Sequence, residues 1–381
     1  MPGRLRRARC VAAGVISLAA LSASVQSPEA EAGPLGRDGM WIWYVSEAGG
    51  SAEAIARKAR NEGIRLVLIK SSDGASEWSQ FTPGLVNGLK SRGMTVCAWQ
   101  FIYGNSPVAE ARRGAEAARK GADCLVVDAE SHYEGRYPAA DRFVRSLRKR
   151  VGRDYPVGFT SFPWVDYHPT LPYSVFLGRG GATLNVPQVY WHTIGTSVGE
   201  ALAHTYTWNL PYDRPIFPLG QTYDDPSLDE IRRFRKLSEG YGAGGVSWWS
   251  WQHTSSSEWD RVGRDIDPPY PNPNRSFPRL GRGTRGDTIL LLQELLRSAG
   301  RRLQIDGTFG DDTVRALKRF QESRGFERTG VTDERTWHAL RELRPVRVRW
   351  SQRGNPSFAR AKQLDLRLAP AIELPPTAGR P

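Results

Sequence analysis

Two acidic side chains stand one residue apart at the end of an apolar run, in the stretch CLVVDAESH at residues 124–132. Side chains alternate along a β-strand, so Asp128 and Glu130 should point to the same side with their α-carbons about 6.5 Å apart. Repulsion between the two carboxylates raises the proton affinity of one of them. A protonated acid beside an ionised one is what glycosidic-bond cleavage needs. The simpler alternative is that the two acids cap a helix or pair with Arg136.

Aromatic and amide side chains accompany this pair along the sequence. Aromatic rings stack on the apolar faces of sugars, and glutamine side chains can hydrogen-bond hydroxyl or N-acetyl groups. Aromatic residues near expected strand ends are Trp43, Trp99, Tyr103, Trp164, Tyr190, Trp191, Trp248, Trp249 and Trp251. Many of these rings are expected to fill the protein interior. The candidate ligand contacts are Asp73, Trp99, Tyr103, Gln188, Tyr190, Trp248 and Trp251.

An alternation of apolar strand, turn and amphipathic helix runs from residue 40 to 264 and must position these groups. It predicts a domain at residues 33–266. The strands are short, continuous apolar runs, as in a parallel sheet that is covered on both faces. They are expected at residues 41–46, 65–70, 95–101, 123–129, 155–160, 185–191, 215–220 and 244–250. Eight such units match an α/β fold of the (β/α)8 TIM-barrel type, with a doubly wound open sheet as the alternative. In a barrel the acid pair ends the fourth strand, at the rim where barrel enzymes place catalytic groups.

The segments outside the barrel differ in composition. Four arginines followed by the apolar run VAAGVISLAAL predict a signal peptide at residues 1–32 and a secreted protein, and that run is too short to span a bilayer. The proline-rich stretch at residues 267–276 predicts a semi-rigid linker, and residues 277–343 a small helical domain. Residues 344–381 hold eight Lys or Arg against two Asp or Glu and show no periodicity. They are expected to form a basic disordered tail, with or without a polyanionic partner.

Several other classes of protein find no support in the sequence. The six histidines lack the spacing of a zinc site, so neither a metal nor a cofactor is expected. Nucleic-acid binding would depend on the basic tail alone, and predicted export argues against it. Cys97 and Cys124 either form a disulfide or are small buried fillers.

The segments IRLVLIKSSDG, GMTVCAWQFIYG, LVVDAES, YPVGFTSFPW and VPQVYW together resemble successive strands of the family 25 glycoside hydrolases, the lysozyme-like muramidases. The resemblance covers most of residues 39–253. It implies that Glu130 is the catalytic acid and that Asp128 assists, for example by orienting the N-acetyl group of the substrate. The family has aspartates on its first strand and near its last, where MWIWYVS and VSWWSWQHT have none, and a tyrosine where Trp99 stands. The barrel is therefore expected either to cleave with Glu130 and Asp128 or to bind glycan without cutting it.

The helical segment contains Gly281, Gly283 and Gly286, a formal G-x-G-x-x-G match. A dinucleotide site requires a strand before this motif, and here a proline-rich segment precedes it. Residues 278–340 instead resemble the three-helix peptidoglycan-binding module. The matching positions are Leu280, Gly281, Gly286, Asp287, Leu291, Gln293, Leu296, Gly300, Ile305, Asp306, Gly307, Phe309, Gly310, Thr313, Ala316, Phe320, Gln321, Gly325, Thr336, Trp337 and Leu340.

These resemblances imply a secreted, muramidase-like glycoside hydrolase that acts on peptidoglycan or a related cell-wall glycan. Its second domain would concentrate the barrel on an insoluble polymer by raising the effective concentration. The alternatives are a cell-wall-binding protein with a degenerate barrel and a hydrolase of another wall polysaccharide. No nucleic-acid partner and no stable membrane insertion are expected. The spacing of the acid pair leaves the bond cut and its stereochemistry open, and the sequence leaves the oligomeric state open.

Overall fold

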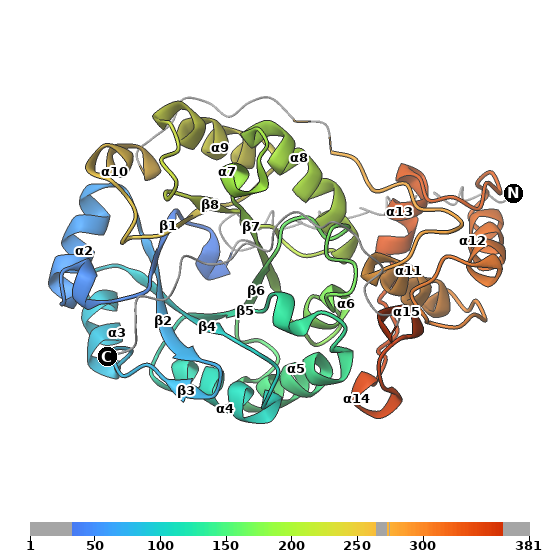
Figure 1. Ribbon diagram of the computed structural model, residues 1–381, viewed down its shortest axis with the longest axis horizontal. Helices are drawn as coiled ribbons and strands as arrows, with labels where there is room; N and C mark the ends of the chain where they lie inside the picture. Colours follow the sequence, from blue (N-terminus) through green and yellow to red (C-terminus); the bar gives the residue numbers. More distant parts are fainter. Residues whose placement is uncertain (1–32, 264–272, 274, 361–381) are drawn as a thin grey trace, which may run out of the picture.

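A computed structural model describes residues 33–263, 273 and 275–360 of the chain. It consists of a barrel with a smaller helical domain at its side (Figure 1). The predicted signal peptide, most of the predicted linker and residues 361–381 lie outside the described residues. Within the described part, no helix is long and apolar enough to cross a membrane.

Eight parallel strands form the barrel in Figure 1, and because the first of them pairs with both the second and the last, the sheet closes on itself. This closure confirms the predicted (β/α)8 barrel and excludes an open sheet. The strands are β1 (Gly39–Ile42), β2 (Leu66–Asp73), β4 (Thr95–Phe101), β5 (Cys124–Asp128), β6 (Val157–Ser161), β7 (Leu184–Val189), β8 (Leu219–Gln221) and β9 (Ser247–Trp249). A short β3 (Ser76–Glu77) extends β2 in the antiparallel sense. The strand expected from residue 215 begins only at Leu219, since Pro218 has no N–H group for the ladder.

Helices cover the outside of the barrel and return the chain from one strand to the next. They are α2 (Ala52–Asn61), α3 (Pro83–Lys90), α4 (Pro107–Arg119), α5 (Tyr137–Val151), α6 (Tyr173–Phe176), α7 (Trp191–Ile194), α8 (Val198–Asn209), α9 (Leu228–Gly240) and α10 (Ser256–Val262). Short 3-10 turns lie at η1 (Gly33–Leu35), η2 (Ser46–Ala48), η3 (Ser131–Tyr133) and η4 (Leu210–Tyr212). The helices α8, α9 and α10 each begin with a capping box, in which a serine and a glutamate three residues later satisfy free backbone N–H groups.

Alternation along each strand sends one set of side chains into the barrel and the other toward the helices. The interior set forms its own hydrophobic cluster, which is rich in aromatic residues and includes Trp41, Trp99 and Trp249. Cys97 of β4 and Cys124 of β5 are register partners and form a disulfide inside this cluster. The sequence had left that pairing open.

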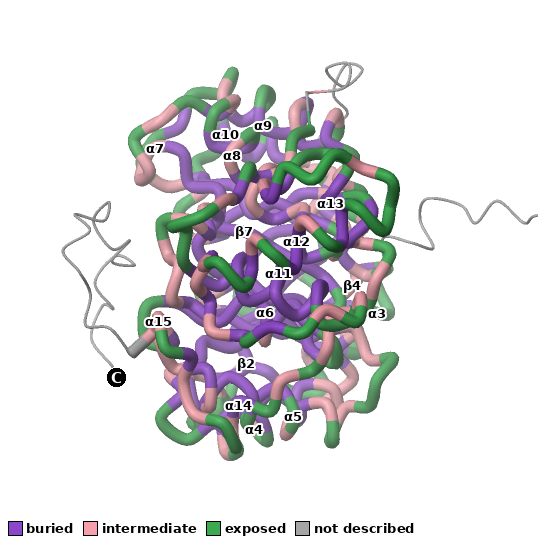
Figure 2. Tube along the Cα trace, turned by 90° about the vertical axis from the view of Figure 1, so that its right-hand side faces the viewer, coloured by how far each residue is buried: buried purple, intermediate pink, exposed green. Residues whose placement is uncertain are grey.

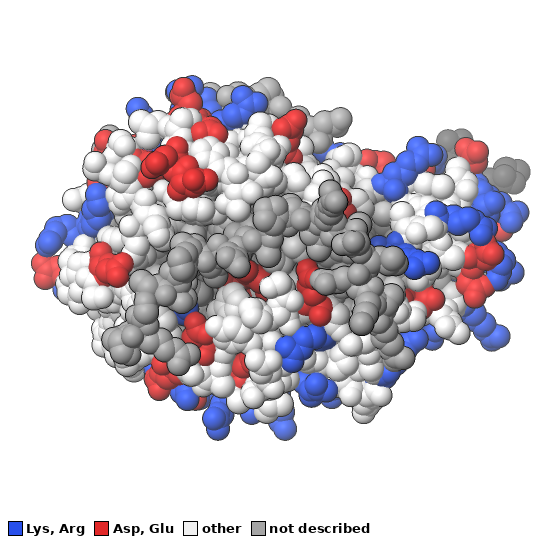
Figure 3. All heavy atoms as spheres, viewed as in Figure 1, with Lys and Arg blue, Asp and Glu red and all other residues white. Residues whose placement is uncertain are grey.

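The C-terminal domain consists of α11 (Asp287–Ser298), α12 (Asp311–Ser323) and α13 (Glu334–Arg341). Two glutamines tie its loops to its helices. The amide oxygen of Gln293 accepts hydrogen bonds from the backbone N–H groups of Asp306 and Gly307, and that of Gln321 accepts one from Gly330. Gln293 and Gln321, two of the positions that match the peptidoglycan-binding module, therefore stabilise the fold of the domain. Figure 3 shows Lys and Arg side chains over the exposed part of this domain with Asp and Glu among them, so its surface has mixed charge.

The two domains are in direct contact through α11. Figure 2 shows α11 as a largely buried helix near α6 of the barrel, with α12 and α13 beside it. Asp287, the first residue of α11, is fully buried and accepts four hydrogen bonds from the barrel. They come from the backbone N–H (2.6 Å) and hydroxyl (2.8 Å) of Ser174 and from the hydroxyls of Tyr137 (2.9 Å) and Tyr212 (2.8 Å). The second domain is therefore docked on the barrel.

The segment after α13 differs from the prediction of a disordered tail that begins at residue 344. Residues up to 360 are described and contain α14 (Trp350–Arg353) and α15 (Ser357–Arg360). Trp350 is buried with its ring centroid 5.3 Å from that of Tyr137. The backbone N–H of Ser351 donates to Asp141 of α5 at 3.0 Å. Three more side chains of this segment pack against the same cluster as Trp350, namely Val346, Val348 and Phe358. A search for periodicity misses these anchors because they do not recur at a fixed spacing.

Candidate active site

Asp128 ends β5 and Glu130 follows two residues later, so both carboxyl groups lie at the carboxyl end of this strand. They are 4% and 5% exposed. Their side chains hydrogen-bond to each other. The side-chain amide of Gln188 on β7 donates to both, at 3.1 Å to Asp128 Oδ1 and 3.0 Å to Glu130 Oε1. The structure thus brings three of the residues singled out in the sequence into one hydrogen-bonded group.

Burial dominates the electrostatics of this group. It raises the pKa of Glu130 to about 7, against the opposing effect of the hydrogen bonds with Gln188 and Asp128. It also raises the pKa of Asp128 well above its ordinary value, with the nearby charge of Glu130 acting in the same direction. Because the two groups titrate together, the pair retains a proton near neutral pH. One member can donate a proton while the other carries a negative charge.

A buried lysine supplies a positive charge in the same region. Lys70 of β2 is 2% exposed and its Nζ lies 2.7 Å from Asp73 Oδ2. Its ammonium group also lies over three indole rings, at 4.4 Å from the centroids of Trp43 and Trp78 and 4.8 Å from that of Trp99. Its charge acts to lower the pKa of Asp128. Lys70 therefore favours the ionised form of Asp128.

Sequence reasoning missed Lys70. A lysine within the apolar strand LVLIKSSD, in step with Leu66 and Leu68, is the pattern that indicates an inward position.

Four of the predicted ligand contacts lie on the inward-facing side of the barrel. They are Asp73, Trp99, Tyr103 and Tyr190. Trp99 is buried and its indole N–H donates to the carbonyl of Ile42. The hydroxyl of Tyr103 donates to Asp73 Oδ1 at 2.7 Å, so both are tied to Lys70. Tyr190 is buried in the same cluster.

Trp248 and Trp251 lie elsewhere, and the structure does not bring them to the acid pair. Trp248 points into the layer between strands and helices, where its indole N–H donates to the carbonyl of Val262 at 2.9 Å. Trp251 packs against Trp259 of α10, with ring centroids 4.7 Å apart. The residue that points inward from β9 is Trp249, whose ring centroid lies 5.3 Å from that of Trp99. Because SWWSW contains two adjacent tryptophans and a third two residues later, the sequence does not indicate which ring faces inward.

Three buried polar atoms on the inward-facing side have no hydrogen-bond partner among the described residues. They are Trp43 Nε1, Thr160 Oγ1 and Gln188 Oε1. Thr160 is the register partner of Asp128 on the neighbouring strand β6, and Gln188 already contacts both acids. A buried polar group without a partner is costly, and a polar ligand can satisfy it. A sugar carries hydroxyl and amide groups suited to this.

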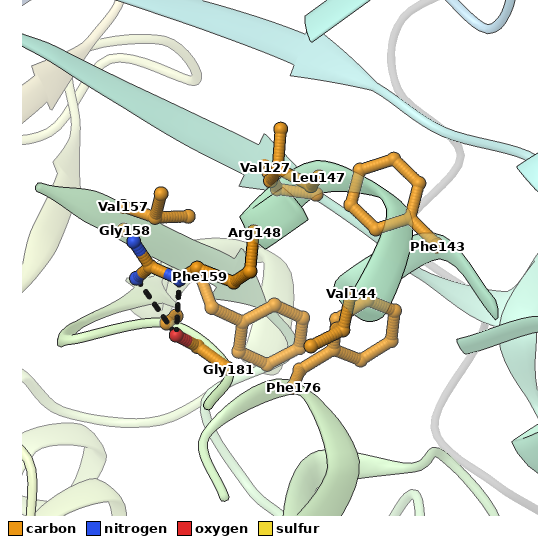
Figure 4. A pocket seen from close by; sticks show the side chains of 11 residues that line it. Val127, Phe143, Val144, Leu147, Arg148, Val157, Gly158, Phe159, Phe176 and Gly181 are labelled. Atoms are coloured by element: carbon orange, nitrogen blue, oxygen red, sulfur yellow. Dashed lines mark hydrogen bonds between the residues drawn. The ribbon is translucent and has the colours of Figure 1, made fainter. Parts of the chain in front are cut away.

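A small apolar cavity behind β5 and β6 is a separate feature (Figure 4). Its volume is about 10 Å³, and its lining includes Val127, Phe143 and Phe176. Arg148 lies at its edge and donates to the carbonyl of Gly181. Val127 alternates with Asp128 and so faces the opposite side of the sheet. This cavity therefore belongs to the packing between strands and helices, and its lining offers no acid or nucleophile for chemistry.

Comparison with known proteins identifies the C-terminal domain. Residues 285–340 match the family model described as "Putative peptidoglycan binding domain". The N-terminal domain of SleB, a solved structure, is 32% identical over 17% of this chain and 90% of its own, with a TM-score of 0.17. No curated protein matches the sequence. The chain therefore carries a peptidoglycan-binding domain, as the sequence predicted.

The barrel is similar in fold to solved structures at low identity. The Bacillus cereus spore cortex-lytic enzyme SleL is 11% identical, with 59% of this chain and 73% of that chain covered and a TM-score of 0.44. A fungal endo-beta-N-acetylglucosaminidase from glycosyl hydrolase family 18 is 12% identical, with 60% of this chain and 95% of that chain covered and a TM-score of 0.42. The resemblance of the barrel to family 25 stays a prediction, because the matching family model covers residues 285–340 and not the barrel.

Proposed function

We propose that the protein is a glycoside hydrolase of the cell wall that cleaves peptidoglycan, with Glu130 as the general acid. The observation that carries the proposal is the buried, hydrogen-bonded pair of Asp128 and Glu130 at the carboxyl end of β5. A carboxyl group with a pKa near 7 is poised to donate a proton at neutral pH. The peptidoglycan-binding domain supports the choice of substrate. Docked on the barrel, it would hold the acid pair on the polymer.

In this mechanism Glu130 protonates the oxygen of the leaving sugar. The side-chain amide of Gln188 donates to both carboxyl groups, so the two groups lie side by side at the rim of the barrel. Both acids therefore act from the same side of the scissile bond. Asp128, kept ionised by Lys70 once the proton has left the pair, would orient the N-acetyl group of the sugar so that its oxygen attacks the anomeric carbon. Water, activated by the now ionised Glu130, then opens the cyclic intermediate from the face that the leaving sugar occupied. Two inversions at the anomeric carbon give the expected outcome, retention of configuration.

The proposed bond is the one that a muramidase cuts, which leaves N-acetylmuramic acid at the new reducing end. The test is to incubate the purified protein with isolated cell walls and to identify the new reducing ends by mass spectrometry. Reducing ends on N-acetylglucosamine would assign the enzyme to the other glycosidic bond. Walls without new reducing ends would contradict the proposal.

A second candidate function is glycan binding without turnover, which one observation favours. In the family 25 pattern the first and last strands carry aspartates, whereas here β1 and β9 direct Trp41 and Trp249 inward. These indoles and Trp99 lie within 5.7 Å of one another by ring centroid. The same wall assay separates the two functions, because a pure binding protein would sediment with the walls and release no new ends.

Replacing Gln188 by Met should move the alkaline limit of activity to higher pH. The amide of Gln188 donates to Glu130 and so opposes the rise in pKa that burial causes. Glu130 acts in its protonated form, so the native enzyme should lose activity as the pH rises through about 7. Without the amide donor the carboxyl group holds its proton to a higher pH. The measurement is kcat/KM on a soluble glycan oligomer across this pH range.

The control for this experiment is Gln221→Met on the neighbouring strand β8. Gln221 is also buried, but it bonds to the backbone of His192 and Tyr223. Its replacement should leave the alkaline limit where it is. An unchanged limit in Gln188→Met, or one that moves to lower pH, would show that Glu130 is not the titrating acid.

A further inference from the structure

Four aromatic rings form a strip along the outer surface of the barrel at α8. Trp164 and Tyr167 come from the loop after β6, and His204 and Trp208 come from α8. The ring centroid of Trp164 lies 5.0 Å from that of Tyr167 and 4.5 Å from that of His204. The centroid of His204 lies 6.2 Å from that of Trp208, with an angle of 29° between the two ring planes. These four residues are called the aromatic strip below.

Tyr167 is the exposed member of the aromatic strip, and the other three rings are half-buried and held in place. Tyr167 is 41% exposed, and among the described residues the other large apolar side chains with comparable exposure are the aliphatic Val108 and Leu228. The indole N–H of Trp164 donates to the carbonyl of Ala201 at 3.3 Å. The ring of His204 is paired with Asp166 at 2.7 Å. Groups that are fixed before binding lose little conformational entropy when a ligand arrives.

The loop that carries Tyr167 also touches the peptidoglycan-binding domain. The carbonyl of Pro169, two residues later, accepts a hydrogen bond from the backbone N–H of Asp287 at 2.8 Å. On the other side, the hydroxyl of Thr207 on α8 lies 3.1 Å from that of Ser276, in the segment that leads into the domain. Figure 1 shows α8 on the side of the barrel where the chain crosses toward α13. The strip thus adjoins the junction of the two domains.

We propose that the aromatic strip is a glycan-binding subsite that continues the peptidoglycan-binding domain onto the barrel, an inference that rests on the proposed function. Planar rings present the faces on which sugar rings stack, and Asp166 and His204 offer hydrogen bonds to hydroxyl groups. The carboxylate of Asp166 is already paired with His204, so it is not free to pair with a cationic side chain of a peptide. Continuity with the peptidoglycan-binding domain identifies the occupant as the glycan strand.

The test measures binding of the full chain in a Glu130→Gln background, in which cleavage is expected to be about 10²- to 10⁴-fold slower. The probe is peptidoglycan glycan strands freed of their stem peptides, titrated by calorimetry. Tyr167→Ala should weaken the Kd about 3- to 10-fold, the contribution of one aromatic stacking contact. Tyr167→Phe keeps the ring and should stay within about twofold of the parent. Leu228→Ala removes a similarly exposed aliphatic side chain from α9 and should leave the Kd unchanged.

Equal binding by Tyr167→Ala and its parent would overturn the proposal. So would a loss that occurs with intact walls but not with stripped strands, since the occupant would then be a stem peptide. A change of oligomeric state in Tyr167→Ala by analytical ultracentrifugation would assign the strip to contact with a second copy of the chain and would also overturn it. Because this assay does not depend on cleavage, its failure is distinct from a failure of the proposed hydrolysis.

Discussion

The variant Glu130→Gln should cleave cell walls about 10²- to 10⁴-fold more slowly than the native protein, because a positioned general acid usually contributes a factor of this size. Glutamine has nearly the same shape and can still accept the hydrogen bond from Gln188, so the fold and glycan binding should persist. It cannot donate a carboxylic proton to the leaving oxygen. The measurement is the rate of appearance of new reducing ends, together with sedimentation of the protein with walls.

The matched control is Glu134→Gln, four residues further along the chain. Glu134 is largely buried but bonds to His168 and Thr170, apart from the acid pair. This substitution should leave the cleavage rate close to that of the native protein. If Glu130→Gln releases reducing ends as fast as Glu134→Gln, the acid pair is not catalytic. Loss of wall binding in Glu130→Gln would show instead that the substitution has disturbed the barrel.

The acid pair and the barrel that carries it could be predicted because both depend on local alternation. Side chains alternate between the two faces of a strand, so residues two apart point to the same side. The shared direction of Asp128 and Glu130 therefore follows from the sequence alone. The choice of Trp248 as a ligand contact was not supported, because β9 spans only three residues and gives no period from which to tell Trp248 from Trp249. In so short a strand, the pairing register with the neighbouring strands decides which side chains face the barrel interior.

The contact between Lys70 and Asp73 shows a second limit of sequence reasoning. Residues three apart on a regular strand face opposite sides, so a bond between them is unexpected. The register of β2 with β4 shifts between Lys70 and Ser72, which marks a local irregularity. A bulge of this kind redirects the side chains after it, and here Asp73 reaches the ammonium group at 2.7 Å. Nothing in the composition of LVLIKSSD indicates where the register will shift.

Docking of the second domain could not be predicted either, because its partners are distant in sequence. The sequence identifies Asp287 as a position of the peptidoglycan-binding module. The side chains that donate hydrogen bonds to it, however, belong to the barrel: Tyr137, Ser174 and Tyr212. A proline-rich linker suggested two units held apart. The buried hydrogen bonds of Asp287 instead hold them together, so the relative position of the glycan-binding domain and the acid pair is set by this contact.

Replacing Asp287 by Ala should destabilise the protein by about 3 kcal/mol or more. Burial raises the pKa of Asp287 to about 6, against the effect of its hydrogen bonds, so the group is ionised at neutral pH and its bonds are charge-assisted. Removing it takes the acceptor from the buried hydroxyls of Tyr137 and Ser174 and from one backbone N–H. The hydroxyl of Tyr212 keeps the hydroxyl of Thr288 at 3.3 Å. The measurement is the free energy of unfolding in urea, with calorimetry to count the transitions.

The control for this substitution is Asp311→Ala, which changes the first residue of α12 in the same way. Asp311 is exposed and paired with Arg282 on the surface, so its loss should cost less than about 1 kcal/mol. Weaker docking predicts a further difference between the variants. Asp287→Ala should unfold in two separate transitions, one for each domain, because the buried hydrogen bonds to its carboxylate are gone. What remains is the backbone bond to Pro169, one longer hydroxyl contact and the surface contacts. It should also keep its rate on short soluble oligomers while losing rate on intact walls, since the domain no longer holds the barrel at a fixed place on the polymer. A single transition and an unchanged ratio of the two rates would show that other contacts between the domains suffice.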